Sequence, residues 1–267
     1  MNIGFIGGGN IAEAIISGLR AAESFDEIRV VEKFNLERLT YLEERYGILP
    51  ADYPALIQDS EVILLTIKPK DIQELLEYIR SFPVQGKLFI SVVAGIPLPV
   101  VEKYLPGAAV VRVMPNTACA VRQAISGMVR GAQVSDNQAA AATRIFQTVG
   151  QTVWTTEEKM NAVTAISGSG PAYYYLFTEY LIQAGVQLGL NASEAEALAK
   201  QTAFGAAQMM LTSEKPVTQL RAEVTSPNGT TYEAIRVFDE QKLKQIISQA
   251  VEACANRGEE MLQEYIK

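Results

Sequence analysis

A short apolar run, Ile3 to Ile6, is followed at once by small residues with the spacing G-x-G-x-x-A at Gly7, Gly9 and Ala12. Such a run is typical of a buried strand, and the apolar positions after it repeat with the period of a helix. In a strand, turn and helix of this kind, the first glycine permits the turn and the second lets the backbone approach a pyrophosphate. The free N–H groups at the helix start face the anion. We therefore predict a dinucleotide-binding domain, with a plain glycine turn as the alternative.

The charges after the second predicted strand bear on the choice of dinucleotide. The strand Ile28 to Glu32 ends in an acid 23 residues after Gly9, close to where a carboxylate can accept the ribose 2′-hydroxyl of NAD. Lys33 and Arg38 stand beside it, and cations there suit the additional phosphate of NADP. The neighbouring charges thus favour different cofactors. The alternative is that Glu32 and Lys33 are ordinary charges at a strand end.

The first half of the chain alternates strands with helices, which predicts an α/β fold with a Rossmann-like doubly wound parallel sheet. In such sheets ligands bind at the carboxyl ends of the strands. Lys68 follows one of these strands and is either a ligand contact or a solvated loop lysine. Ser135 and Gln138 form a capping box that opens a helix to about Gln147. The further predicted strands are Glu61 to Ile67, Leu88 to Val93, Ala109 to Val113 and Gln151 to Trp154.

Composition excludes several classes of function. A net charge of −7 without a long Lys/Arg cluster argues against nucleic acid as a partner. No apolar run is long enough for a membrane span, so we expect a soluble, cytoplasmic protein. Cys119 and Cys254 have no metal-ligand spacing, which supports neither a disulfide scaffold nor a metal site. The sequence has no histidine, which excludes mechanisms that need an imidazole base or ligand.

The second half has a different character. From about Met160 strand signals nearly stop, and we predict two domains, 1–158 and 159–267, the second all-helical. Ser169 and Pro171 suit the start of a helix. That helix carries a run of aromatic residues between Tyr173 and Tyr180, which are either core or pocket lining. Because the helices are too few to bury their apolar faces alone, we predict that this half packs against its copy in a homodimer.

Two further helix starts are predicted in this half. Ser193 and Glu196 have the spacing of a capping box, and so do Thr230 and Glu233. The second box places the hydroxyl-rich loop Ser226 to Gly229 directly before a helix N-terminus, where free N–H groups would bind a small carboxylate. The alternative is a well-capped turn without a ligand.

With these residues in view, the chain closely resembles the pyrroline-5-carboxylate reductase family along nearly its whole length. Asn228 departs from the family pattern because glycine is usual there, although asparagine tolerates a left-handed backbone. Glu32 departs as well, because many relatives have a neutral residue before a cation. The resemblance is carried by Gly7 to Ala12, Thr66 to Pro69, Ser91 to Gly95, Arg112 to Thr117, Thr164 to Ala172 and Leu220 to Thr231.

The resemblance implies reduction of the imine of 1-pyrroline-5-carboxylate to L-proline, the last step of proline biosynthesis, in a homodimer that can assemble into a decamer. NADPH would be the hydride donor, with NADH as the alternative. Thr231 would be catalytic, and the substrate would be held by Ser226, Gly229, Thr230, Thr231 and Glu214. The cofactor would be held by Ile6, Gly7, Gly8, Gly9, Asn10, Ile11, Ala12, Glu32, Lys33, Thr66, Ile67, Lys68, Pro69, Val93, Ala94, Gly95 and Asn116.

Two other functions fit parts of the pattern. A two-domain β-hydroxyacid dehydrogenase also joins a Rossmann half to helices, but it generally relies on a lysine in the helical domain. The stretch Ser167 to Tyr175, where we would look for it, contains no lysine. A non-catalytic nucleotide-binding relative is the second alternative, and the intact loop Ser226 to Thr231 argues against it.

Overall fold

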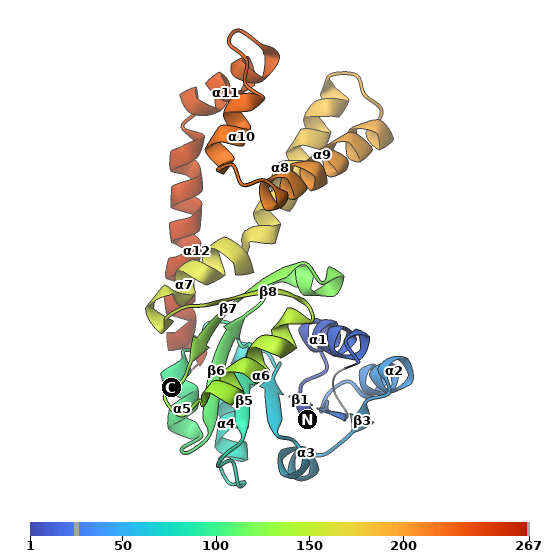
Figure 1. Ribbon diagram of the computed structural model, residues 1–267, viewed down its shortest axis with the longest axis vertical. Helices are drawn as coiled ribbons and strands as arrows, with labels where there is room; N and C mark the ends of the chain where they lie inside the picture. The colour runs from blue at the N-terminus through green and yellow to red at the C-terminus, as the bar shows by residue number, and fades with distance from the viewer. Residues whose placement is uncertain (24–26, 266–267) are drawn as a thin grey trace. The chain divides into compact units, whose positions relative to one another are not determined.

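The computed structural model describes residues 1–23 and 27–265 of the chain, which form two compact units. The first unit holds residues 1–169 together with the chain from Ala253, and the second holds Gly170–Glu252. Most of the helices and strands are labelled in Figure 1.

The first unit is built on one sheet with eight strands among the described residues. The strand order is β3-β2-β1-β4-β5-β6-β7-β8, and the pairs from β3 to β6 are all parallel, as the sequence predicts. The order reverses between β1 and β4, which is the place where doubly wound sheets bind ligands. The strands are β1 (Ile3–Ile6), β2 (Ile28–Val31), β3 (Leu49–Pro50), β4 (Val62–Leu65), β5 (Leu88–Ser91), β6 (Ala109–Met114), β7 (Ala124–Arg130) and β8 (Gly150–Trp154).

Two strands, the two-residue β3 and the longer β7, were not predicted. Strand β7 runs antiparallel to β6. The link between β6 and β7 is short and contains one 3-10 turn, Thr117–Val121. A link of this length cannot form the helical crossover that parallel neighbours require, so the chain turns back. The helix after β7 then crosses to β8, which restores a parallel pair at the sheet edge.

Helices cover both faces of the sheet (Figure 1). The helices α1 (Asn10–Ala21), α2 (Leu36–Tyr46) and α6 (Asp136–Gln147) pack on one face. The other face is covered by α3 (Tyr53–Asp59), α4 (Ile72–Ile79) and α5 (Leu98–Tyr104). Because successive strand residues point to opposite faces, a strand covered on both sides must be apolar throughout, which explains the continuous apolar runs. The predicted capping box of Ser135 opens α6.

The boundary between the compact units differs from the predicted boundary at 158/159 because the next elements pack on the sheet. Helix α7 (Met160–Val163) and the π-turn Thr164–Gly168 belong to the first unit. Met160 is buried in the core on the sheet face that α3, α4 and α5 cover, and a Cβ added to Gly127 of β7 would lie 2.5 Å from the Val163 side chain. Ser169 follows the π-turn in a right-handed helical conformation, and the next helix begins at Gly170, close to the helix start predicted there.

The second unit is helical, as predicted. It contains α8 (Gly170–Gln187), α9 (Ala192–Thr212), α10 (Val217–Glu223), α11 (Thr230–Glu240) and the first part of α12 (Leu243–Tyr265). The prediction that Ser193 caps α9 is wrong, because the Asn191 side chain accepts from the Glu194 N–H and Glu194 completes the box. The Ser193 hydroxyl instead donates to the Asn191 side-chain oxygen.

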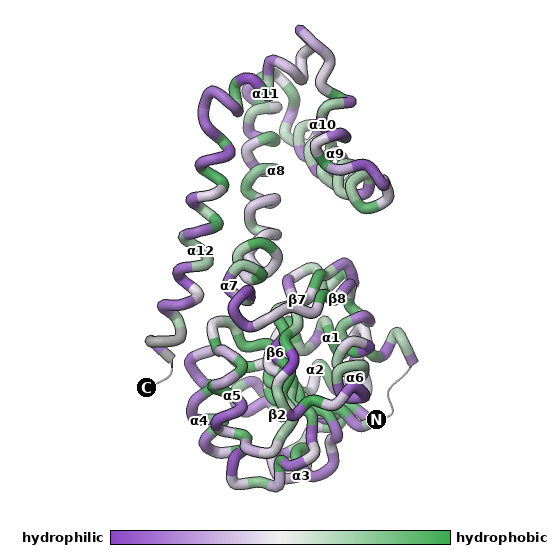
Figure 2. Tube along the Cα trace, turned by 60° about the vertical axis from the view of Figure 1, so that its left-hand side comes forward, coloured by the Kyte–Doolittle hydropathy of each residue, from purple (hydrophilic) through white to green (hydrophobic). Residues whose placement is uncertain are grey.

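Few side chains of this unit are buried. Within its described residues, Gly170, Ala195 and Ala199 are the buried positions, whereas hydrophobic segments recur along α8 and α9 (Figure 2). The aromatic residues of α8 that we predicted to be core or pocket lining are at least one-third exposed in the single chain. No helix among residues 1–23 and 27–265 is long and apolar enough to cross a membrane.

Candidate functional site

The glycine turn after β1 lies at the point where the strand order reverses. Gly7 adopts φ +103°, a conformation that L side chains rarely take, and a Cβ there would lie 2.7 Å from the Thr66 carbonyl oxygen. Only glycine therefore fits this position. The Gly7 N–H donates to the Val31 carbonyl at 2.8 Å, which ties the turn to β2.

Thr66, directly after β4, holds the same turn from the other side. Its hydroxyl contacts the carbonyl oxygens of Ile6 at 3.0 Å and Gly7 at 2.8 Å, and its N–H donates to Ile6 at 2.9 Å. The Thr66 side chain thus has a structural role in shaping the predicted cofactor site. Because the Thr66 hydroxyl donates to backbone carbonyl groups, its proton is not available to a ligand.

The open part of the turn is at Gly9, the N-cap of α1. Nothing lies within 4 Å of a Cβ added to Gly9, although its φ of −67° would accept a side chain. No side chain among the described residues caps α1, and the first backbone bond of the helix runs from Glu13 to Gly9 at 2.9 Å. The space at Gly9 and the uncapped N–H groups of a 12-residue helix fit a pyrophosphate.

Glu32 reaches from the end of β2 to the glycine turn. Its carboxylate accepts from the Gly8 N–H at 2.8 Å and from the Phe34 N–H at 3.1 Å. Lys33 beside it is exposed, with its ammonium 3.9 Å from the Glu74 carboxylate and 5.3 Å from the centre of the Phe34 ring. Phe34 itself is 80% exposed.

Arg38 also reaches the turn, but it has partners within the protein. Its Nε donates to the Gly8 carbonyl at 2.8 Å, and its terminal nitrogen forms an ion pair with Glu13. The hydroxyls of Tyr41 and Tyr46 both donate to the other Glu13 oxygen at 2.9 Å. Burial alone would raise the pKa of Glu13, but hydrogen bonds from Arg38 and the two tyrosines hold it below its ordinary value. This cluster was not predicted, since its members are distant in sequence.

The remaining residues of the predicted cofactor site differ in how far their side chains are exposed. Asn10 and Lys68 are exposed, and Ile11, Ile67, Pro69 and Ala94 are half-buried. The side chains of Ile6, Ala12 and Val93 are fully or almost fully buried in the core, so they shape the site by packing and can offer only backbone groups to a ligand.

Asn116 and Gly95 are held by other parts of the first unit. The Asn116 amide donates to the Ser167 carbonyl at 3.1 Å, and its oxygen accepts from the Ala118 N–H at 3.1 Å. Asn116 thus joins the end of β6 to the π-turn. Gly95 adopts φ +74°, and a Cβ there would lie 3.0 Å from Met261 of α12.

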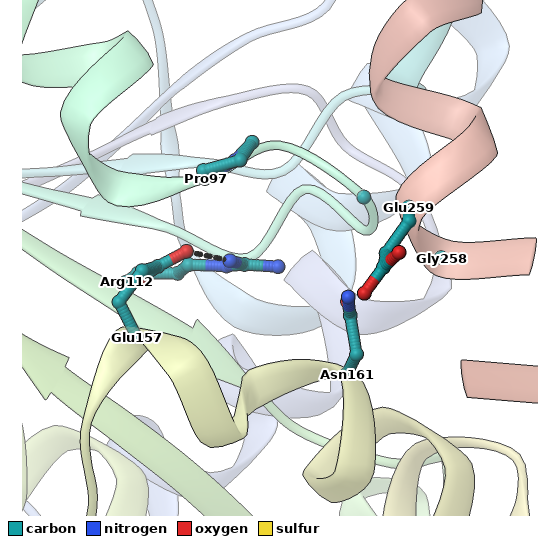
Figure 3. Close-up of a pocket in the computed structure, with 7 residues that line it drawn as sticks. Pro97, Arg112, Glu157, Asn161, Gly258 and Glu259 are labelled. Carbon is teal, nitrogen blue, oxygen red and sulfur yellow. Dashed lines mark hydrogen bonds and ion pairs between the residues drawn. The ribbon is translucent and has the colours of Figure 1, made fainter. Parts of the chain in front are cut away.

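A cavity of about 320 Å³ lies in the first unit beside Gly95 (Figure 3). Arg112 points into it from β6, and Asn161 and Glu259 approach from α7 and α12. Arg112 is 5% exposed and paired with Glu157, and its burial lowers the pKa of the guanidinium, which the Glu157 charge partly offsets. The sequence signal for this pair is an arginine inside an otherwise apolar strand. Gly258, Pro97 and Gly95 complete the lining.

In the second unit, the loop Ser226 to Gly229 leads directly into α11. Asn228 adopts φ +59°, the left-handed conformation that asparagine tolerates, and the Gly229 N–H donates to the Ser226 carbonyl at 2.9 Å. The predicted capping box of Thr230 is wrong, because Gly229 is the N-cap and has no side-chain cap. The Glu233 carboxylate instead accepts from Arg236 at 2.9 Å. The first N–H groups of α11 therefore have no capping side chain among the described residues.

Glu214 lies on the link between α9 and α10 and is exposed. Its neighbour Lys215 forms an ion pair with Glu223 at the end of α10, with Nζ to carboxylate distances of 2.8 and 2.9 Å. This pair places the link beside the end of α10, three residues before Ser226. The described residues contain no group of acidic or cysteine side chains that could hold a metal ion.

Known proteins match both units. The chain is 36% identical to pyrroline-5-carboxylate reductase 2 of Bacillus subtilis over 267 residues, which cover 98% of this chain and 96% of that protein. The chain belongs to the pyrroline-5-carboxylate reductase family. The family model for pyrroline-5-carboxylate reductase dimerisation matches residues 157–261, and the model for coenzyme F420-dependent NADP oxidoreductases matches residues 2–95.

Solved structures of pyrroline-5-carboxylate reductases have the same fold. The enzyme from Coxiella burnetii is 37% identical, with a TM-score of 0.91, and the match covers 97% of this chain and 98% of that one. The pyrroline carboxylate reductase of Plasmodium falciparum, solved with NADP bound, is 27% identical with a TM-score of 0.87, covering 98% of both chains. The Rossmann-like sheet followed by helices is thus the architecture of this reductase family.

Proposed function

We propose that this protein reduces the C=N bond of 1-pyrroline-5-carboxylate to give L-proline, the last step of proline biosynthesis, with NADPH or NADH as hydride donor. The observation that carries the proposal is the match over nearly the full length to reductases of this name. Two features of the chain agree with it: the open glycine turn at Gly9 and the hydroxyl-rich loop before α11.

In this proposal the first unit binds the dinucleotide. The backbone of Gly7, Gly8 and Gly9 and the uncapped start of α1, with Asn10 and Ile11, would receive the pyrophosphate. Glu32 and Lys33 would lie at the adenosine end. The residues that follow β4 and β5, Thr66 to Pro69 and Val93 to Gly95, would line the nicotinamide side. Asn116 would support that side through Ser167, because both of its polar atoms already have protein partners.

The second unit would bind the substrate. The uncapped N–H groups of α11, which has 11 residues, suit a carboxylate, because a helix N-terminus carries partial positive charge. Ser226 and Thr230 are exposed and Gly229 is half-buried, so their hydroxyl and backbone groups are available to the same anion. Glu214 would lie near the substrate from the adjacent link.

The nicotinamide supplies the hydride for the imine carbon when it is bound. The protein must then orient the ring and leave the ring nitrogen protonated. Thr231 would hydrogen-bond the nitrogen, and the proton would already be on the imine or arrive through water, since a threonine hydroxyl is too weak an acid to be its sole source. The chain contains no histidine, so no imidazole can take this role.

We also propose that the protein is a cytoplasmic homodimer that can assemble further, up to a decamer, without nucleic acid or membrane partners. The match of residues 157–261 to a dimerisation model supports the dimer. So does the second unit itself, in which large apolar side chains such as Phe204, Leu198 and Leu211 are more than half exposed. A single-chain unit with so little buried apolar surface would be marginally stable.

The direct test is to mix the protein with pyrroline-5-carboxylate and NADPH or NADH and follow the absorbance of the reduced nicotinamide. We expect loss of reduced nicotinamide and formation of proline in equal amounts. A β-hydroxyacid dehydrogenase would oxidise hydroxy acids and leave the imine unchanged. A non-catalytic relative would bind the dinucleotide without turnover, and either result would overturn the proposal.

A further inference from the structure

The adenosine end of the glycine-turn site has an arrangement of charges that bears on the choice between NADH and NADPH. These cofactors differ by one phosphate on the adenosine ribose. In Rossmann sites, the residues after the second strand distinguish NADH from NADPH. An acid there receives the ribose 2′-hydroxyl of NADH, or an arginine receives the 2′-phosphate of NADPH. This chain has both residue types there, Glu32 and Arg38, so the sequence alone leaves the preference open.

The structure fixes the position of the acid. One oxygen of the Glu32 carboxylate accepts from the Gly8 N–H at 2.8 Å and the other accepts from the Phe34 N–H at 3.1 Å. The carboxylate is therefore held against the glycine turn, at the end of the second strand, where an acid would receive the adenosine ribose in a Rossmann site. The negative charge of Glu32 also acts on Tyr53. Burial raises the pKa of the Tyr53 hydroxyl, and the charge of Glu32 raises this pKa further.

Arg38 already has two hydrogen-bonding partners within the protein. Arg38 donates its Nε to the Gly8 carbonyl at 2.8 Å and forms an ion pair with Glu13, and both side chains are 22% exposed. Tyr41 and Tyr46 hold the Glu13 carboxylate in place from its other side. Arg38 can offer a phosphate only the N–H groups that these two contacts leave. To turn its whole guanidinium toward a phosphate, it would have to leave a carboxylate that then keeps only two tyrosine hydroxyls. This exchange costs free energy.

Lys33 is the other cation near this end of the site. Its side chain is 58% exposed, and its ammonium lies 3.9 Å from the Glu74 carboxylate and near the Phe34 ring. An exposed, flexible ammonium contributes little to an ion pair because water and salt screen it. A fixed carboxylate close to the bound group acts more strongly on a phosphate with two negative charges.

We infer that the adenosine end of this site selects against the 2′-phosphate, so that NADH is bound more tightly than NADPH, with Glu32 as the specificity-determining residue. This inference rests on the proposed function only in placing a nicotinamide dinucleotide at the glycine turn. NADPH remains a usable donor, bound more weakly. The preference would be the reverse of the one that family resemblance implies.

The experiment is calorimetric titration of the intact protein with NADH and with NADPH, without substrate. We expect wild-type protein to bind NADH at least about tenfold more tightly, because the fixed Glu32 carboxylate repels the 2′-phosphate of NADPH. Glu32→Gln keeps a side-chain oxygen that can accept from the Gly8 N–H but removes the charge. This variant should shift the affinity ratio toward NADPH by about tenfold or more.

Glu44→Gln is the matched control, because it removes the same charge from an exposed position on α2. Its affinity ratio should stay within about twofold of wild type. The inference is overturned if wild-type protein binds NADPH as tightly as NADH, or if Glu32→Gln leaves the ratio unchanged. The wild-type titration decides the preference even if the variant folds poorly. A protein that binds NADH preferentially but does not reduce the imine would contradict the proposed function and leave this inference intact.

Discussion

The Thr66 hydroxyl lies 2.8 Å from the carbonyl oxygen of Gly7, so the residue after β4 fixes the turn after β1. The two residues come from neighbouring strands at the point where the sheet order reverses. Because Gly7 carries the positive φ of the turn, Thr66 stabilises the one backbone conformation that opens the start of α1 to an anion.

Replacing Thr66 by valine should therefore weaken both folding and dinucleotide binding. The variant keeps the shape of the side chain and loses the one hydroxyl donor that is shared between the Ile6 and Gly7 carbonyl oxygens, which should lower the free energy of unfolding by about 1–2 kcal/mol. Chemical denaturation and calorimetric titration with NADH would measure the two effects. Thr40→Val is the control, since its hydroxyl contacts only Leu36 within α2. Equal effects from both variants would refute a special role for Thr66.

Alanine substitutions at Gly7 and at Gly9 should have very different effects on the stability of the protein. Gly7→Ala places a Cβ 2.7 Å from the Thr66 carbonyl at φ +103°, and should lower the free energy of unfolding by about 2 kcal/mol or more. Gly9→Ala meets no protein atom within 4 Å, so the melting temperature should stay near that of wild type.

The same Gly9→Ala variant should lose dinucleotide affinity, because its methyl group would occupy the space that the pyrophosphate needs. Thermal melting with and without NADH separates the two effects: Gly9→Ala should melt normally alone and gain little from NADH. If NADH stabilises Gly9→Ala as much as wild type, the pyrophosphate does not lie at Gly9.

The cluster of Glu13, Arg38, Tyr41 and Tyr46 should make the free energy of unfolding depend on pH in the acidic range. Because hydrogen bonds from Arg38, Tyr41 and Tyr46 outweigh burial and lower the pKa of folded Glu13, its contribution is present above the unfolded pKa. This contribution is lost as the pH falls through the folded pKa. The free energy of unfolding of wild-type protein should thus fall more steeply between about pH 5 and about pH 3 than that of Glu13→Gln. Denaturant titrations at several pH values would measure this dependence, with Glu44→Gln as the control. If the free energy of unfolding of wild type and of Glu13→Gln falls equally steeply with pH, the prediction is wrong.

The sequence predicts most of the first unit because its signals are local. Buried strands such as Ile3–Ile6 and Val62–Leu65 are apolar throughout, and the Ser135 capping box lies within four residues. Strand β7 was missed because Ser126 and Gly127 interrupt its apolar run, and its antiparallel direction depends on the length of a link and not on its own residues. The Glu13 cluster joins two helices, and no pattern in either helix indicates it.

The helix starts in the second unit were harder to predict, for a physical reason. Several polar residues near each start could cap, and the sequence does not say which one has an extended backbone. Asn191 was preferred over Ser193, and Gly229 over Thr230. The loop before α11 was nevertheless located correctly, because Asn228 and Gly229 mark a turn whichever residue caps the helix.

The exposed apolar side chains of α9 should mediate self-association. Phe204 is 58% exposed on this helix, and Phe204→Glu would place a charge in the proposed dimer interface. We expect wild-type protein to sediment as a dimer or larger species, and Phe204→Glu to weaken dimerisation by about tenfold or more. Leu36→Glu, which changes a 69% exposed residue of the first unit, should leave the assembly unchanged. A wild-type monomer at micromolar concentration would refute the dimer.

The role proposed for Thr231 can be separated from that of its neighbours on the same loop. Thr231 is the second residue of α11 and is half-buried, whereas the Thr225 hydroxyl is turned back to the Arg221 carbonyl at 2.6 Å. A hydroxyl that hydrogen-bonds the ring nitrogen contributes most in the transition state, so Thr231→Val should lower kcat/KM by about 10- to 100-fold, mainly through kcat. Thr231→Ser should retain most activity, and Thr225→Val should behave as wild type. Unchanged kcat/KM in Thr231→Val would show that the nitrogen is oriented by the carboxylate contacts alone.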